Sequence, residues 1–200
     1  MVAFLMRLMW LILITAIIAL WVPTVGICEE ATGNVNFAIG ALWTADDFSE
    51  AFDMDKRIEI GAICDVKKKN WPISIAFEYL FSYGNSRTSE NSYGLLENMN
   101  VDVYYSEMYV GVKKVFNHFP SVKPFVGGGL YTVNVYVDIS YDDEYNVGIG
   151  GWVGAGAYFM LLKHLDIGLE WKWSKANVTI FDKDFDVGGN HFDLMIGYHF

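Results

Sequence analysis

Hydrophobic and polar residues alternate along most of this chain with a period of two. Between residues 71 and 83 the odd positions are all apolar or aromatic, whereas the even positions include Ser74, Ala76 and Glu78. Residues 125–139 repeat the pattern, with Phe125, Tyr131, Val133, Val135, Val137 and Ile139 opposite Thr132, Asn134 and Asp138. Successive side chains of a strand point to opposite faces, so this period predicts strands with one apolar face.

The alternation recurs in eight segments, which we predict to be strands at residues 34–43, 57–66, 72–83, 102–116, 124–140, 147–162, 165–178 and 191–200. Alternating segments of this kind, separated by turn-rich loops, are typical of an antiparallel transmembrane β-barrel. Two irregularities stand out. Ile63 interrupts the polar face of the second segment, and Ala176 and Val178 reverse the alternation of the seventh, which predicts a bulge after Ser174.

The polar face carries charges near the strand centres: Glu59, Glu78, Glu107, Glu170, Lys172 and Asp193. The opposite face carries large aromatic residues such as Trp171 and Trp173. We therefore predict that the charges line a barrel interior, with Arg57 and Lys113 nearer its ends, and that the aromatic face contacts lipid. A soluble lipocalin-like barrel is the alternative, because its strands also alternate.

The connections between the predicted strands differ in length and charge. Residues 67–71, 117–123 and 163–164 are short connections near which lysines gather, whereas residues 44–56 and 87–100 are long and the acid-rich 181–190 is of medium length. Membrane barrels keep short turns on the periplasmic side and longer loops outside. The sequence thus predicts an acidic extracellular end.

The first 28 residues are typical of a secretory signal peptide. Arg7 precedes an uninterrupted apolar run at residues 8–20, and Gly26 and Cys28 are small enough to precede a cleavage site. This predicts a signal peptide at residues 1–28 and one barrel domain at residues 29–200. A retained membrane anchor and lipidation of Cys28 are the alternatives.

Composition excludes several classes of protein. The 200-residue chain has a net charge of −10, so nucleic acid is not an expected partner. Its two cysteines are too few for a disulfide framework or a cysteine zinc site.

The last ten residues alternate Phe192, Leu194, Ile196, Tyr198 and Phe200. This ending resembles the C-terminal signal by which the barrel assembly machinery recognises outer-membrane barrels. Residues 124–130 and 154–158 resemble the glycine-rich central strands of the small outer-membrane β-barrel domain family, which includes the OmpA transmembrane domain, OmpX and the opacity proteins. The resemblance implies an all-β, eight-stranded up-and-down barrel in the cell outer membrane, with lipid and lipopolysaccharide as its surroundings.

Candidate chemistry is sparse. An eight-stranded barrel is wide enough only for its own side chains, and we expect Trp152, Tyr158 and an ion-pair network to fill it, although crowded carboxylates also suit a proton or cation path. No histidine–serine pair of the lipid A deacylase type is evident, and His191 alone of the histidines lies near the long loops.

The acidic loop at residues 182–189 spaces its carboxylates like a calcium loop, but Val187 occupies the position that requires glycine. We assign no catalytic, cofactor or metal residues, and we expect at most weak divalent cation binding at the acidic loops. The sequence predicts a non-enzymatic surface barrel that serves envelope integrity or surface interaction, with narrow porin-like transport and a lipid-acting enzyme as alternatives.

Overall fold

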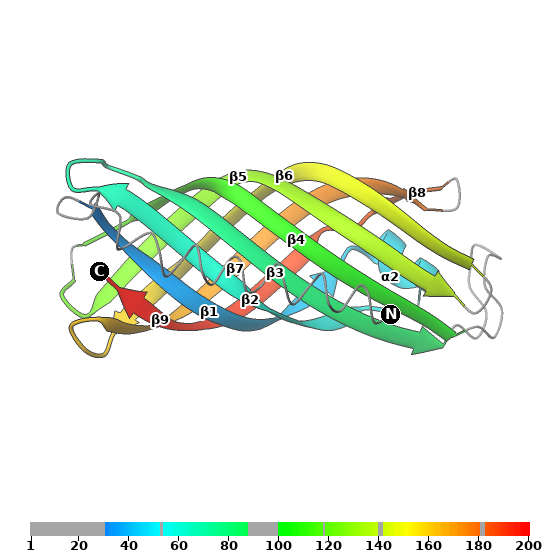
Figure 1. Cartoon of the computed structure of the whole chain (residues 1–200), viewed down its shortest axis with the longest axis horizontal. Helices are drawn as coiled ribbons and strands as arrows, with labels where there is room; N and C mark the ends of the chain where they lie inside the picture. Colours follow the sequence, from blue (N-terminus) through cyan, green and yellow to red (C-terminus); the bar gives the residue numbers. More distant parts are fainter. Residues whose placement is uncertain (1–30, 53, 88–99, 118, 140–141, 181–182) are drawn as a thin grey trace.

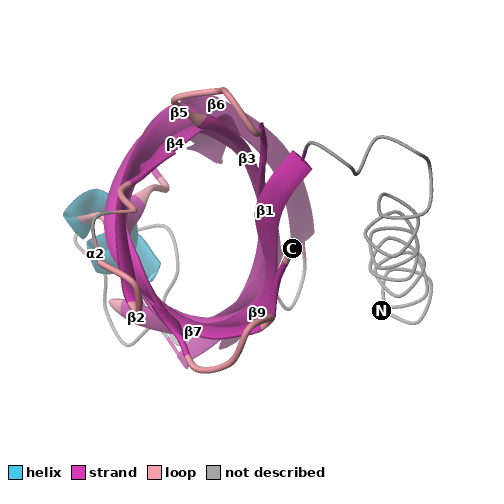
Figure 2. Ribbon diagram, turned by 90° about the vertical axis from the view of Figure 1, so that its left-hand side faces the viewer, coloured by secondary structure: helices cyan, strands magenta, loops and turns pink. Residues whose placement is uncertain are grey.

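The computed structural model describes residues 31–52, 54–87, 100–117, 119–139, 142–180 and 183–200. The predicted signal peptide, its cleavage site and Cys28 lie outside these residues. The described chain is a single antiparallel sheet that closes on itself (Figures 1 and 2). No helix in the described ranges is long and apolar enough to cross a membrane.

Eight long strands form the wall: β1 (Ala31–Thr44), β2 (Lys56–Lys68), β3 (Ser74–Arg87), β4 (Asn100–Val115), β5 (Val122–Ile139), β6 (Asp142–Met160), β7 (Leu165–Ile180) and β9 (Gly189–His199). Each pairs with its neighbours in the chain, and β1 pairs with β9 to close the barrel. All eight predicted strands are therefore confirmed, with boundaries shifted by up to five residues. Two further elements are new: the short helix α2 (Asp46–Phe52) and the strand β8 (Lys183–Asp186).

The strands are staggered around the barrel. Following the paired residues once around the wall from Asn34 leads back to β1 at Thr44, ten residues farther along the strand. A stagger of this size requires strongly tilted strands, roughly 35–45° from the barrel axis, and the tilt is visible in Figure 1. The C-terminus and the short turns share one end, while α2 and β8 lie at the other, which we call the loop end (Figure 1).

The predicted bulge after Ser174 is wrong. β7 pairs with β6 without interruption from Asp166 to Ala176. On the other edge of β7, β8 and β9 pair in the same register, so no residue is inserted between them. Ala176 and Val178 keep their parity and point inward because the interior at the loop end is apolar.

Most of the predicted faces are confirmed. The apolar residues of β3, β7 and β9 are exposed on the outer wall, including Ile75, Trp171 and Phe192, whereas Ala76 is fully buried. The interpretation of β5 is wrong: Phe125, Tyr131, Val133, Val135 and Val137 point into the barrel, and its outer face carries residues such as Val126 and Leu130. Large apolar residues are exposed on all the long strands of the wall, which fits a lipid environment and not a soluble barrel.

Candidate functional site

The barrel interior is the site to which the sequence assigned the charges. Glu59, Glu78, Glu107, Glu170, Lys172 and Asp193 all point inward and are at most 3% exposed, together with Arg57, Lys113, Trp152 and Tyr158. The prediction of a charged, side-chain-filled interior is confirmed for these residues. The placement of Lys113 nearer an end is wrong, because its ammonium group reaches Glu78 and Glu170 at the centre. Sequence reasoning missed two interior residues that carry chemistry, Asp65 and His191, although each has the inward parity of its strand.

Two lysines organise the centre of the interior. Lys113 Nζ lies 2.7 Å from Glu78 Oε1 and 3.0 Å from Glu170 Oε1. Lys172 Nζ forms an ion pair with the second oxygen of Glu78 and lies 3.9 Å from Asp193 Oδ2. Glu78 thus bridges the two ammonium groups, and this ion-pair network links β3, β4, β7 and β9 across the barrel.

Aromatic rings surround the two ammonium groups. Lys172 Nζ lies 4.3 Å from the centroid of the Tyr109 ring, and Lys113 Nζ lies 4.7 Å from that of Phe125. Trp152 lies about equally far from both ammonium groups, at 5.9 and 6.0 Å. Cations over ring faces are stabilised most when they are desolvated, so these rings stabilise the two ammonium groups inside the barrel.

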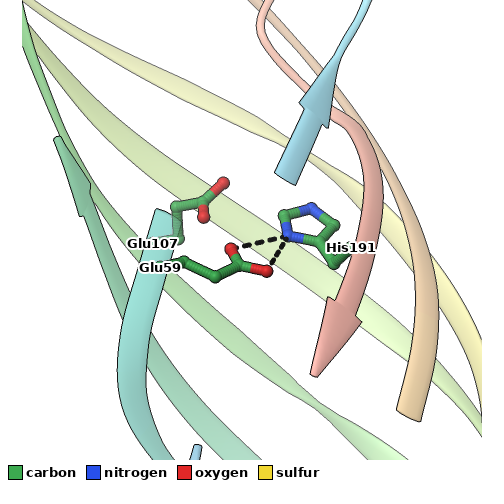
Figure 3. Close-up of side chains that lie close together, drawn as sticks. All are labelled: Glu59, Glu107 and His191. Atoms are coloured by element: carbon green, nitrogen blue, oxygen red, sulfur yellow. Dashed lines mark hydrogen bonds and ion pairs between the residues drawn. The ribbon is translucent and has the colours of Figure 1, made fainter. Parts of the chain in front are cut away.

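A second group of polar residues surrounds His191 on β9. His191 Nδ1 lies 2.9 Å from Glu59 Oε2 on β2, and His191 Nε2 lies 2.9 Å from Ser174 Oγ on β7 (Figure 3 shows the Glu59 contact). Tyr109 contributes a hydroxyl 3.2 Å from the same Nε2. The side chain of Glu107 on β4 approaches the pair from the opposite wall (Figure 3).

Ser174 and His191 thus form a buried serine–histidine contact that the sequence did not indicate. Ser174, His191 and Glu59 stand in the nucleophile–base–acid order that hydrolases use. All three side chains are buried inside the barrel, with Ser174 only 1% exposed. Because a nucleophile must touch its substrate, this arrangement cannot act on lipids at the outer wall.

Above this group, α2 lies at the loop end (Figure 1), and its apolar residues belong to the buried cluster inside the barrel. Phe48, Ala51 and Phe52 lie on one face of the helix, with the spacing of adjacent helical turns, and all three are buried. The Phe48 ring contacts Phe52 and Tyr105, with centroids 4.5 and 5.7 Å away. We call these residues the apolar plug, together with the inward valines of β4 and β5 and the side chains of Ile180, Phe185 and Val187.

The plug explains the apolar inner face of β5 at the loop end. Val133, Val135 and Val137 pack in the same cluster as the α2 phenylalanines, so the inner face of this strand is apolar where it passes the plug. Arg57 connects the plug to the polar layer below, since its guanidinium lies 3.5 Å from the centroid of the Tyr105 ring.

A row of tyrosines runs across the outer face near the loop end. Tyr83, Tyr104, Tyr136 and Tyr145 are paired residues on four successive strands. Tyr83 donates a hydrogen bond to Asp102 Oδ1 (2.8 Å) and Tyr145 donates one to Asn134 Oδ1 (2.7 Å). Aromatic residues with polar partners are typical of the membrane interface, so the row marks where the wall leaves the lipid.

The acidic segment after β7 forms a hairpin. Asp184 Oδ1 accepts a hydrogen bond from Thr179 Oγ1 at 2.6 Å, and Asp186 Oδ2 lies 3.6 Å from Lys175 Nζ. Phe185, between them, and Val187, directly after Asp186, are buried. The two carboxylates therefore lie along a strand with partners of their own, while Asp182 lies outside the described residues.

Comparison with known proteins agrees with this architecture. The family described as outer membrane protein β-barrel domain matches residues 17–200. Among curated proteins, none matches the chain.

Several solved structures share the fold. Neisserial surface protein A has a TM-score of 0.56 at 15% identity, covering 86% of this chain and 98% of that one. Ail, the attachment invasion locus protein of Yersinia pestis, solved with the heparin analogue sucrose octasulfate, has a TM-score of 0.53 at 14% identity and the same coverage. The N-terminal β-barrel domain of Pseudomonas aeruginosa OprF has a TM-score of 0.51 at 11% identity, covering 86% and 100%.

Proposed function

The chain belongs to the outer membrane protein β-barrel domain family, and we propose that it is a non-enzymatic surface protein that serves envelope integrity or surface interaction through its acidic loop end. Its location is the outer membrane, where lipid and lipopolysaccharide surround the wall. The observation that carries the proposal is the filled interior: an ion-pair network occupies the centre and the apolar plug closes the loop end. The exposed loop end is then the part available to a partner outside the cell.

The charge of that end indicates the kind of partner. Its described acids include Glu50, Asp55, Asp138, Glu144 and Asp184, whereas the sequence there offers few lysines. Opposite charges favour encounter and like charges disfavour it. We therefore propose a cationic partner surface and not a polyanion of the kind found with Ail.

Charge substitutions on intact cells test this proposal. A loop-neutral variant carries Glu50→Gln, Glu144→Gln, Asp184→Asn and Asp186→Asn. Binding of its cells to a lysine-rich polypeptide should fall by about tenfold, because each rim charge contributes a few tenths of a kcal/mol to about 1 kcal/mol. Wild-type cells should bind the polypeptide and not heparin.

The matched control neutralises four charges at the opposite end, with Lys67→Gln, Lys68→Gln, Lys69→Gln and Lys163→Gln. This variant faces the periplasm in the proposed orientation and should bind like wild type. Equal loss of binding in both variants, or none in either, would contradict a role for the acidic end.

The two alternatives have less support. Narrow transport requires a continuous path, which the ion-pair network and the plug obstruct. A lipid-acting enzyme requires an accessible nucleophile, and the serine of the Ser174–His191–Glu59 arrangement is buried.

Export and assembly complete the proposal. Residues 1–28 are a signal peptide, so N-terminal sequencing of the membrane-extracted protein should begin at or near Glu29; an intact Met1 would contradict this.

Phe200 exchanges backbone hydrogen bonds of 3.0 Å with Gly33 at the closing edge of the barrel. We propose that the assembly machinery recognises the strand ending there, so a chain lacking Phe200 should reach the outer membrane at a several-fold lower level.

A further inference from the structure

Three potential metal ligands from three strands meet inside the barrel. Glu59 on β2, Glu107 on β4 and His191 on β9 each offer one ligand atom, and these atoms all lie within 4.8 Å of one another (Figure 3). All three residues are fully buried. A carboxylate and imidazole donor set suits divalent first-row transition metals better than calcium or magnesium, which prefer oxygen alone.

The two carboxylates of this group form no direct ion pair with a described lysine or arginine. In the described part of the chain, neither Glu59 nor Glu107 forms an ion pair with a lysine or arginine, since both interior lysines are engaged by Glu78 and its neighbours. Glu107 Oε1 accepts a hydrogen bond from Tyr131 (2.6 Å), but Glu107 Oε2 is buried with no hydrogen-bond partner. A buried carboxylate oxygen without a partner is costly, and this one belongs to a side chain that reaches toward Glu59 and His191.

Asp193 adds another buried carboxylate to this group. It lies two residues from His191 on the inward face of β9 and fills the space that Gly40 leaves open. Its Oδ1 has no hydrogen-bond partner, and its Oδ2 lies 3.9 Å from Lys172 Nζ, which is longer than a hydrogen bond. The fully buried charged residues of the described chain comprise seven acids against three lysines and arginines. The interior thus carries an excess of negative charge, to which Glu59 and Glu107 contribute beside His191.

The imidazole is oriented as metal-binding histidines usually are. Its Nε2 lies 2.9 Å from Ser174 Oγ and 3.2 Å from the Tyr109 hydroxyl, so it can donate its hydrogen to either oxygen. That tautomer leaves the Nδ1 lone pair directed at Glu59. Ligating histidines commonly use one nitrogen for the metal and donate from the other to fix the ring.

We propose that Glu59, Glu107 and His191 bind one divalent transition metal ion, of which zinc is the best representative, with Asp193 as an adjacent acid and Ser174 and Tyr109 as positioning residues. Ligand atoms about 2.0–2.2 Å from zinc require the donors to move closer than their present limit of 4.8 Å, which rotation of the glutamate side chains provides. The ion would join β2, β4 and β9 directly beneath the apolar plug.

Burial determines how the ion would enter. Because the ligands are fully buried below the plug, the folded barrel exchanges metal slowly and acquires it during folding. Protein unfolded in urea and refolded into detergent micelles with zinc, then passed over a chelating resin, should retain about one zinc per chain by elemental analysis. Zinc added to protein already folded with a chelator should bind far less. The proposal would be overturned if both samples bound zinc in proportion to the amount added and lost it to the resin.

Substitutions identify the ligands. His191→Gln and Glu107→Gln should each lower the retained zinc at least about tenfold, and Ser174→Ala should weaken binding by about 10–100-fold. Glu170→Gln is the matched control, since it removes an equally buried carboxylate of the ion-pair network and should keep the metal. His164→Ala, at the exposed short-turn end, controls for adventitious binding and should also keep it.

Wild-type protein provides a test that does not depend on variants that fold poorly. Refolding with cobalt in place of zinc should give visible absorption bands from a low-symmetry nitrogen–oxygen site, and zinc present during refolding should abolish them. Absence of these bands in protein that shows the heat-dependent gel shift of a folded barrel would overturn the proposal, whatever the function of the acidic loops.

Discussion

Arginine in place of Ile39 should destabilise the folded barrel by roughly 2–4 kcal/mol, the cost of a cation on the lipid face near the bilayer midplane. Ile39 lies in the middle of β1 and is 47% exposed on the outer wall. Its paired residues, Ile60 and Leu194, are also exposed and apolar. The measurement is the urea midpoint of unfolding in phospholipid vesicles, with the folded fraction taken from unboiled gels.

Val147→Arg is the matched control. Val147 is similarly exposed on β6 but pairs with Asn134 close to the tyrosine row. A cation near the membrane interface costs about 0–1 kcal/mol, so this variant should unfold close to wild type. If Ile39→Arg and Val147→Arg unfold alike, the outer wall at Ile39 does not face lipid.

Leucine in place of Glu78 should cost about 3–5 kcal/mol, because it removes the carboxylate that both interior lysines share. Lys113 would keep only Glu170, and Lys172 would keep only Asp193 at 3.9 Å. Thermal unfolding followed on unboiled gels measures the loss, and the variant's transition should occur at a much lower temperature than that of wild type.

Glu50→Leu supplies the comparison, since Glu50 is an exposed acid on α2. Exposed substitutions usually change stability by within about 0.5 kcal/mol. Similar small effects of both substitutions would mean that Glu78 faces water, as it would in a soluble sheet.

The number of strands and most side-chain orientations could be predicted, because lipid outside and charges inside leave a period of two in the sequence. The short and long connections could be predicted from the spacing of these segments. The parity that places Glu78 inward and Ile75 outward is a purely local signal, and it persists through β3, β7 and β9. Ile63 kept its inward parity although it is apolar, which shows that parity is more reliable than polarity at a single position.

The wrong predictions for the β5 valines and for Ala176 and Val178 share one physical cause. Helix α2 inserts phenylalanines into the loop end, so the inner faces of β5 and β7 become apolar there and polarity no longer distinguishes inside from outside. The valines of β5 and the apparent bulge at Ala176 and Val178 both follow from this packing. Nothing in the strand pattern indicates where a loop helix will dock.

The residues around His191 are far apart in the sequence. Glu59 and His191 are separated by 132 positions and Ser174 and His191 by 17. Only the register of β1 between β2 and β9 brings Glu59 and His191 to the same level. The available signal was parity, because His191 shares the inward face of β9 with Asp193.

The central claim is that the barrel is sealed and acts through its exposed end. The conductance of the purified folded protein in planar lipid bilayers tests this claim most directly. The ion-pair network and the apolar plug predict a baseline without discrete current steps, the same as that of bilayers without protein. Reproducible steps of uniform size that disappear when the protein is heat-denatured before insertion would contradict a sealed interior.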